Sequence, residues 1–306
     1  MSGGYWSWVQ LAQVSIPGCL AELKRRVPRV LKHFGIRMTY HLDTHSGTTF
    51  TYDANPRRPY NATEFVAARK ELGAEFEKYG VNVTSECLME PYLGYIGHVW
   101  ALFDWGTIWE GEEHVPFANF IYHGVASWNS GSAKDEAAIL DSLIAGGGAG
   151  MESLPATDNW LRNLDLLYLI QPVYTALRQR KWSDFRQAGG TRTVDYAPRP
   201  RSPGGRGSFI EVNDEKKTYR VVVDGRLMAQ DFATVFPSPR GKGAWLAYSR
   251  ADRELDWPAP AGWKDGAVKG VTLTEGGPGI RVEGRIAKGR LRVALKARQP
   301  VRLTPA

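Results

Sequence analysis

Two carboxylates are the residues best placed for chemistry in this sequence, because each ends a run with strand character. Asp43 closes the run IRMTYHLD, and Glu86 closes the run VNVTSE. Glycoside hydrolysis needs such a pair: one carboxylate attacks the anomeric carbon and one carboxylic acid protonates the leaving oxygen. In a retaining glycosidase the two groups lie about 5–5.5 Å apart. Neighbouring parallel strands lie about 4.8 Å apart, so carboxylates on adjacent strand ends suit this reaction.

The stretch between the two carboxylates predicts the elements that position them. Asn61 and Glu64 have capping-box spacing, which predicts the start of a helix, and Gly80 predicts its end. Apolar residues recur on one face of this helix at Phe65, Ala68, Leu72, Phe76 and Tyr79. A strand, a helix and a strand with a connection of this length predict a right-handed βαβ unit with parallel strands. Asp43 and Glu86 should then share one edge of a sheet.

The neighbours of the two carboxylates predict different protonation states and a sugar-binding surface. Apolar surroundings raise the pKa of a carboxyl group, and Glu86 is followed by Leu88, Met89, Tyr92 and Trp105. Asp43 should stay ionised among polar neighbours. We expect the substrate to contact aromatic or hydrogen-bonding side chains, namely Tyr40, His41, His45, Trp105, Trp109 and His123, with Trp128 as a further stacking candidate. The same aromatic residues would also suit packing in a core.

Two alternative functions are also consistent with the sequence. A metal-dependent barrel hydrolase could bind a divalent ion through His41, Asp43, His45, Glu86 and His123. A non-catalytic carbohydrate-binding protein could instead use the tryptophans near the C-terminus, Trp245, Trp257 and Trp263. The glycosidase hypothesis itself requires no metal and no cofactor.

Composition and charge exclude several other classes of protein. A chain of 306 residues with 43% hydrophobic and 23% charged residues can bury a sizeable core. Residues 201–306 hold 20 Lys or Arg and 11 Asp or Glu, so the net charge of +7 arises there, and residues 1–200 are slightly acidic. We therefore expect a carbohydrate partner rather than nucleic acid. No segment has the pattern of a signal peptide or a membrane span. Cellular location and oligomeric state stay open.

The rest of the chain alternates helices and strands and then changes character. Helices are expected at 19–35, at 135–147 and at 157–182, the last interrupted at Pro172, and further strands at 115–124 and 148–155. Residues 198–207 have the composition of a linker, and period-2 runs follow it. We expect a (β/α) TIM-type barrel over residues 1–197 and an antiparallel β-sandwich over residues 208–306. Because about four βα units are visible where a full barrel has eight, the barrel is expected to be partial.

The order of these strand ends resembles a known family. A strand ending in Tyr-x-x-Asp (YHLD), an amphipathic helix, a strand ending in Glu (VTSE) and the run VPFANFIYHG are similar to endo-α-N-acetylgalactosaminidases of glycoside hydrolase family 101 and related α-N-acetylgalactosaminidases of family 129. The resemblance covers residues 30–130. It implies that Asp43 is the nucleophile and Glu86 the acid/base of a retaining enzyme. The implied substrate is α-linked N-acetylgalactosamine, or a related α-galactoside, of O-glycans.

Two features depart from the family pattern. The interval of 43 residues from Asp43 to Glu86 is longer than the family would lead one to expect, with TTFTYDANPRRPY as the evident insertion. The early barrel strands, which would complete the sugar pocket, are also missing from this sequence. Whether the enzyme acts within a glycan or at its end cannot be read from these residues.

Overall fold

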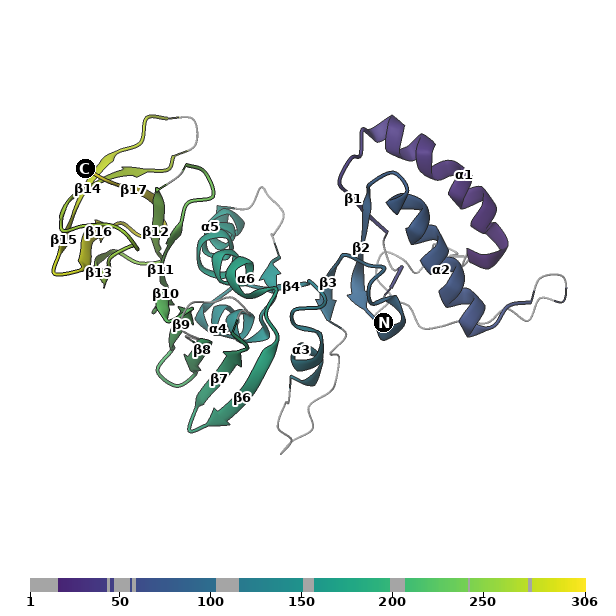
Figure 1. The fold of residues 1–306 in the computed structure, drawn as a ribbon, viewed down its shortest axis with the longest axis horizontal. Coiled ribbons are helices and arrows are strands. Elements are labelled where there is room, and N and C mark those ends of the chain that lie inside the picture. The colour runs from purple at the N-terminus through teal and green to yellow at the C-terminus, as the bar shows by residue number, and fades with distance from the viewer. Residues whose placement is uncertain are drawn as a thin grey trace. The chain divides into compact units, whose positions relative to one another are not determined.

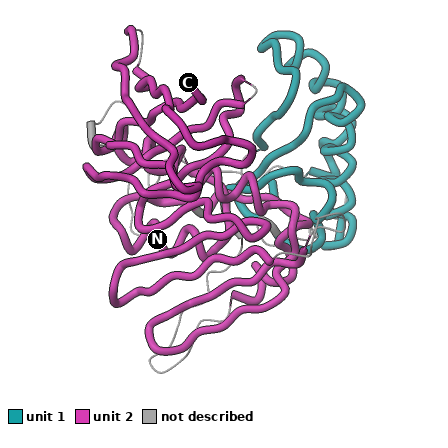
Figure 2. Tube along the Cα trace, turned by 60° about the vertical axis from the view of Figure 1, so that its left-hand side comes forward, with its two compact units in different colours: residues 1–103 teal, residues 104–306 magenta. Residues whose placement is uncertain are grey.

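The computed structural model describes residues 16–42, 45–46, 56, 59–102, 116–150, 157–198, 207–241, 243–274 and 277–306. The chain divides into two compact units, residues 1–103 and residues 104–306. Figure 1 shows the secondary structure of both units, and Figure 2 shows which part of the chain belongs to each.

The described residues of the first unit form a three-stranded parallel sheet with the α-helices α1 and α2 and a short 3-10 helix. Its strand order is β1-β2-β3, and β1 and β2 pair from Thr39 opposite Asn82 to His41 opposite Thr84. The predicted βαβ unit with parallel strands is therefore confirmed. The elements are α1 (Ile16–Phe34), β1 (Thr39–His41), α2 (Ala62–Glu77), β2 (Asn82–Leu88), the short 3-10 helix η1 (Glu90–Tyr92) and β3 (His98–Leu102).

Helix α2 covers one face of this sheet and begins where the sequence predicts. The Glu64 backbone N–H donates to the Asn61 side chain at 2.9 Å, and the Asn61 N–H donates to the Glu64 carboxylate at 2.8 Å. This is the predicted capping box, which satisfies two of the four unpaired N–H groups at the helix start. The apolar face of α2 is buried through Phe65, Ala68, Leu72 and Phe76.

Helix α1 and strand β3 complete the unit. Helix α1 runs through Pro28, buries Val27 and Leu31, and is joined to α2 by an ion pair between Lys24 and Glu71 at 2.7 Å. Strand β3 is not among the strands expected from the sequence. This five-residue strand follows Gly97 and mixes polar and apolar residues, so its period-2 signal is weak and the sequence pattern did not reveal it.

The second unit begins with helices and two short parallel strands. A strand was predicted over 115–124, and this prediction is wrong, because α3 (Phe117–Tyr122) occupies it. A short apolar run cannot distinguish a strand from a helix, and Phe117, Phe120 and Ile121 have helical spacing. The other elements are β4 (Asn129–Gly131), α4 (Glu136–Ala145), β5 (Gly148–Ala149), α5 (Thr157–Asp165), the π-helical turn η2 (Leu166–Ile170) and α6 (Gln171–Leu177).

The predicted interruption at Pro172 is confirmed. The helix that begins with α5 widens into the π-helical turn η2, which ends at Ile170, two residues before Pro172. Pro172 lacks the N–H that a continuous α-helix would use. The irregular turn leaves backbone carbonyls in need of donors. The buried Thr234 hydroxyl donates to the Tyr168 carbonyl at 2.7 Å, so this carbonyl is satisfied from the neighbouring sheet.

All strands from β6 onward form one antiparallel sheet of twelve strands in the order β13-β16-β15-β14-β17-β12-β11-β10-β9-β8-β7-β6. The strands are β6 (Trp182–Ala188), β7 (Thr191–Tyr196), β8 (Ser208–Asn213), β9 (Thr218–Val223), β10 (Arg226–Gln230), β11 (Ala233–Pro237), β12 (Trp245–Ser249), β13 (Arg253–Pro258), β14 (Gly266–Thr272), β15 (Arg281–Ala287), β16 (Arg290–Leu295) and β17 (Val301–Pro305). The antiparallel β region that the sequence predicted is present.

The sheet starts before the predicted linker. Strands β6 and β7 precede residues 198–207, and β7 pairs with β8 across them, with Tyr196 opposite Ser208. One apolar core lies between the helices α4 to α6 and the strands β6 to β10, and a second lies within the strands β11 to β17. The helical part of the second unit and the first strands of its sheet therefore fold around a common core.

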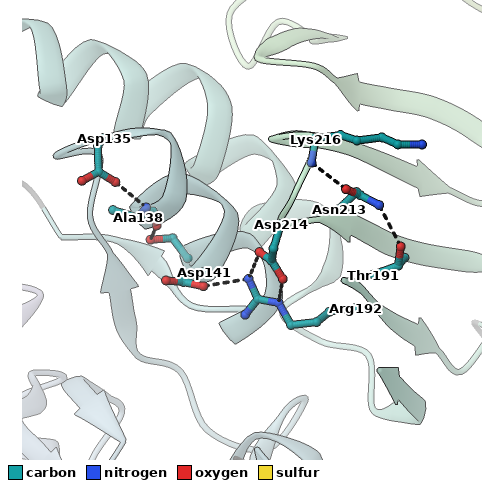
Figure 3. A network of polar contacts seen from close by, with 9 residues as sticks. Asp135, Ala138, Asp141, Thr191, Arg192, Asn213, Asp214 and Lys216 are labelled. Carbon is teal, nitrogen blue, oxygen red and sulfur yellow. Dashed lines mark hydrogen bonds and ion pairs between the residues drawn. The ribbon is translucent and has the colours of Figure 1, made fainter. Parts of the chain in front are cut away.

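A guanidinium group joins helix α4 to this sheet (Figure 3). Arg192, in β7, donates to Asp141 of α4 at 2.7 Å and binds both carboxylate oxygens of Asp214 at 2.6 and 2.8 Å. The N-terminus of α4 is capped by Asp135, which accepts from the Ala138 N–H. Two acidic side chains converge on one arginine here, and the predicted helix at 135–147 is confirmed.

A fully buried carboxylate joins the helical segment to the far part of the sheet. Asp165, at the end of α5, accepts a hydrogen bond from the Tyr248 hydroxyl at 2.7 Å. Its second oxygen lies 3.1 Å from Arg298 and 3.3 Å from Arg250. A buried charge is tolerated only when it is paired and hydrogen-bonded, as this one is.

No helix among the described residues is both long and apolar enough to span a bilayer.

Replacing Asp165 by Asn should destabilise the second unit strongly. The substitution keeps the size of the side chain but leaves the charges of Arg298 and Arg250 without their buried partner, a loss of about 3–5 kcal/mol in the free energy of unfolding. Urea denaturation followed by tryptophan fluorescence measures it. Asp252→Asn removes an exposed ion pair with Lys296 and should leave the midpoint nearly unchanged. Equal midpoints for the two variants would contradict this account of Asp165.

Candidate active site

The predicted site residues fall into three groups. Tyr40, His41, His45 and Glu86 are described in the first unit, and His123 is described in the second. Asp43, Trp105 and Trp109 lie outside the described residues. The surroundings of the proposed pair of carboxylates are therefore defined by Glu86 and by the described neighbours of Asp43 in the chain.

Glu86 lies on the face of the sheet that carries His41. The His41 ring nitrogen Nδ1 lies 3.1 Å from the Thr84 hydroxyl, which places both side chains on one face. Glu86 follows Thr84 by two residues in β2, and alternate residues of a strand share a face. Strand β2 does not end at Glu86, as the sequence suggested, but continues for two more residues to Leu88.

An aromatic pair lies on the same face. The ring of Trp100, in β3, stacks on the ring of His41 with centroids 4.7 Å apart and planes 10° apart. The pairing of Ser85 with Val99 and of Cys87 with Ala101 puts Trp100 in register with Glu86. Trp100 is 55% exposed, and the Nε2 atom of His41 is buried without a hydrogen-bond partner among the described residues.

A buried serine ties the chain on both sides of Asp43 to β2. The Ser85 hydroxyl donates to the Leu42 carbonyl at 2.8 Å and accepts from the Ser46 N–H at 3.0 Å. The Leu42 N–H donates to the Thr84 carbonyl at 2.9 Å, and the Ser46 hydroxyl donates to the Cys87 carbonyl. The chain is thus bonded to β2 at Leu42 and again at Ser46.

His45 packs on the opposite side, against α2. Its Nε2 donates to the Arg69 carbonyl at 3.1 Å, and the Arg69 guanidinium donates to the His45 carbonyl. Burial lowers the pKa of His45 to about 4, with the nearby Arg69 charge acting in the same direction. His41 and His45, which were named together as alternative metal ligands, therefore have different surroundings.

Two aromatic residues near the predicted site also pack on the α2 side. The Tyr40 ring stacks on Phe76 of α2 at 5.0 Å, and Tyr92 is fully buried with its ring 6.2 Å from that of His45. Successive residues of a strand point to opposite faces, so Tyr40 and His41 are separated by the sheet. Tyr40 and Tyr92 serve packing in this structure rather than the face that carries Glu86.

His123 is a core residue of the second unit. It follows α3, is only 1% exposed, and hydrogen-bonds to the Arg180 carbonyl through Nδ1. Its ring makes edge contacts with Trp128 and Tyr196 at 5.5 and 5.2 Å, and burial lowers its pKa. Trp128, the further stacking candidate, is likewise buried.

The metal-binding alternative gains no ligand set from the described residues, which include no group of three or more His, Cys, Asp or Glu able to hold an ion. His45 uses its Nε2 in a backbone hydrogen bond, and His123 uses its Nδ1 in another.

Trp100 was missed at the sequence level, although it is the aromatic residue in register with Glu86. The available signal was the run HVWAL, in which His98 and Trp100 are separated by the buried Val99. That alternation is the period of a half-buried strand. It was obscured because the surrounding stretch is rich in glycine and aromatic residues.

No family model matches this sequence, and no curated protein matches it. Solved structures of the α-N-acetylgalactosaminidase NagBb from Bifidobacterium bifidum do match. The ligand-free structure gives a TM-score of 0.54 at 14% identity over 69% of this chain and 35% of that chain. The GalNAc complex gives a TM-score of 0.52 at 15% identity over the same shares.

This likeness shows a shared fold. The chain spans about a third of the length of NagBb, so the shared fold is that of part of NagBb. The fold shared with NagBb agrees with the resemblance of the strand ends, which named α-N-acetylgalactosaminidases.

The burial of His45 predicts a pH-dependent stability. The free energy of unfolding should fall as the pH falls from about 6.5 to about 4, because the unfolded ring binds a proton in this range and the folded ring does not. The full shift is worth about 3 kcal/mol. In His45→Gln this contribution is absent, so the difference between wild type and variant should shrink as the pH falls.

Urea denaturation at pH 7 and at pH 4.5 measures this difference. His123 adds its own pH dependence, which is common to both proteins and cancels. His33→Gln, at an exposed position of α1, serves as the matched control and should keep the wild-type slope. A parallel pH dependence of wild type and His45→Gln would contradict the account.

Proposed function

We propose that this protein is a retaining glycosidase that acts on α-linked N-acetylgalactosamine or a related α-galactoside, with Asp43 as nucleophile and Glu86 as acid/base. The observation that carries the proposal is the face shared by Glu86, His41 and Trp100 on a parallel sheet. The substrate class is supported by the resemblance of the strand ends to families 101 and 129. It is supported also by the likeness to the α-N-acetylgalactosaminidase NagBb.

Asp43 is assigned as the partner of Glu86 because of its neighbours in the chain. Leu42 and Ser46 are bonded to Thr84, Ser85 and Cys87, which surround Glu86 in β2. Asp43 follows Leu42 directly, and adjacent parallel strands have the separation that a retaining pair needs.

The aromatic pair supplies a surface for the sugar ring. A flat apolar ring with half of its area exposed, such as Trp100, suits the C–H face of a pyranose. The Nε2 atom of His41 is a buried polar atom without a protein partner among the described residues, so a sugar hydroxyl would satisfy it. Stacking on Trp100 fixes the orientation of the His41 ring for this role.

The reaction would proceed in two steps. Asp43 attacks the anomeric carbon while Glu86 donates its proton to the glycosidic oxygen, so the bond to the aglycone breaks and a glycosyl-enzyme ester forms. Glu86 then accepts a proton from water, and the water oxygen replaces Asp43 at the anomeric carbon. The configuration is retained because the centre is inverted twice.

The larger architecture that we propose is a partial (β/α) barrel over residues 1–197, a linker at 198–207 and a β-sandwich over 208–306. The last strands of the first range, β6 and β7, already belong to the antiparallel sheet and connect the two parts. The parallel sheets β1-β2-β3 and β4-β5, each with a crossover helix, support the barrel part. The role of an accessory domain for the last strands is part of the same proposal.

Variants of the two carboxylates should reveal their separate roles, because the reaction rate of each variant should depend differently on the leaving group of the substrate. Glu86→Gln should still release an activated aryl group from a dinitrophenyl α-N-acetylgalactosaminide in a rapid burst, because such a group needs no proton. Hydrolysis of the methyl glycoside should fall roughly 10²–10⁴-fold, since it needs general acid catalysis. Asp43→Ala should show neither burst nor turnover. Stopped-flow absorbance and product analysis measure these effects.

Glu90→Gln is the matched control, because Glu90 is the nearest other acidic residue after Glu86. It should keep the wild-type rates on both substrates. A leaving-group pattern found in Glu90→Gln instead of Glu86→Gln would overturn the assignment of the acid. Failure of the wild-type chain to release either aglycone would overturn the proposed activity.

Trp100→Ala should weaken substrate binding more than it slows the chemical step. Loss of a stacking surface of this kind is worth about 1 kcal/mol, so KM should rise about fivefold with kcat little changed. Steady-state kinetics on the aryl glycoside measures both constants. Trp160→Ala, at a similarly exposed tryptophan of α5, should leave KM at its wild-type value. An unchanged KM in Trp100→Ala would remove this residue from the sugar-binding surface.

A further inference from the structure

A second candidate site lies in the twelve-stranded sheet. A pocket of about 590 Å³ opens between the strands β9 to β12 and the strand β13 with the residues that follow it. This volume is typical of sites for small molecules. All of its lining belongs to the second unit, so it is separate from the sheet that carries Glu86.

The floor of the pocket is aromatic and apolar. It includes Trp245 and Trp257, two of the three tryptophans that the sequence suggested for glycan binding, with Leu227 and Val235 beside them. Trp257 is 4% exposed, and its indole N–H has no acceptor among the described residues. A buried donor of this kind suits a ligand hydroxyl.

The rim of the pocket is cationic. Arg290 donates a hydrogen bond to Asp256 at 2.9 Å, so the charges of these two residues neutralise each other. Arg220 and Arg226 are exposed, and within the described part of the chain neither forms an ion pair. The rim therefore carries net positive charge. Its guanidinium groups can hydrogen-bond to a carboxylate or a sulfate.

The hairpin that carries Arg226 is held rigidly. Asp224 and Gly225, with φ of 51° and 74°, form the tight turn between β9 and β10 that favours Asp-Gly. The buried Arg180 binds both oxygens of Asp224 at 2.9 and 2.8 Å, and the Asp224 N–H donates to Ser208 at 2.8 Å. The turn next to the pocket is thus fixed from the interior of the unit.

A bulge in β10 shapes the lining. The pairing of β10 with β9 shifts by one residue between Leu227 and Ala229. In a regular strand Leu227 and Gln230 would point to opposite faces, because they are three residues apart. With the extra residue both line the pocket, and bulges commonly redirect side chains in this way.

We propose that this pocket binds a saccharide that carries an anionic group, with the sugar ring on the tryptophan floor and the carboxylate or sulfate at Arg226 and Arg220. The protein would then hold an acidic glycan through the β domain independently of hydrolysis at Glu86. The proposal goes beyond the proposed activity, since it concerns a different surface and needs no turnover.

Titration calorimetry of the full chain with three probes tests the proposal. Lactose is the neutral probe, sialyllactose carries a carboxylate, and lactose 3′-sulfate carries a sulfate. At least one acidic probe should bind at least tenfold more tightly than lactose, and the better of the two identifies the anionic group. Equal binding of all three, or binding of none, would overturn the proposal, as would tighter binding of a single-stranded oligonucleotide.

Two variants locate the binding. Arg226→Ala should weaken the acidic probe roughly tenfold, as expected for the loss of a charged hydrogen bond. Arg281→Ala, at an exposed arginine of β15 outside the pocket, should bind like wild type. Arg226→Ala should also leave hydrolysis of the aryl glycoside unchanged, so failure of this site and failure of the proposed activity can be told apart. Equal affinity in Arg226→Ala and Arg281→Ala would overturn the assignment.

Discussion

The parallel pairing of β1 with β2 is the constraint on which the candidate active site depends, and the Ser85 hydroxyl secures it. One buried hydroxyl donates to the Leu42 carbonyl and accepts from the Ser46 N–H, so the chain is fixed to β2 before and after it passes Asp43. Helix α2 occupies one face of the sheet, where its Phe76 stacks on Tyr40 and its Arg69 carbonyl accepts a hydrogen bond from His45. The other face is left to Thr84, Glu86, His41 and Trp100, which is why the polar and aromatic groups of the site gather there.

In the second unit, buried ion pairs hold distant elements together. Asp165 holds the end of α5 to Tyr248, Arg250 and Arg298, and Arg180 holds the β9–β10 turn through Asp224. Because an unpaired buried charge is costly, each of these groups specifies one arrangement of its neighbours. The result is a rigid scaffold for the pocket lined by Trp245 and Trp257.

Local signals allowed much of the fold to be predicted from the sequence. The capping box at Asn61, the stop at Gly80 and the break at Pro172 are chemical features of a few adjacent residues, and all three appear in the structure. The parallel arrangement of β1 and β2 followed from the connection length. The predictions failed for short apolar runs. The helix at Phe117–Tyr122 was predicted as a strand, and strand β3, which contains Trp100, was not predicted. Which face His45 or Tyr40 takes depends on tertiary contacts with α2, which spacing alone does not contain. The roles of Asp43, Trp105 and Trp109, outside the described residues, stay predictions.

The continuous ladder from β6 to β13 has an evolutionary consequence. The composition of the sequence changes near residue 200, yet the backbone hydrogen bonds between β7 and β8 join the segments before and after that point. Thr234 and Tyr248 also hydrogen-bond to the helical segment that precedes it. A recombination event that exchanged the C-terminal strands as a cassette would sever both the ladder and these links. The terminal strands can therefore be inherited together with the helices α4 to α6, but they are poorly suited to being shuffled as an independent module.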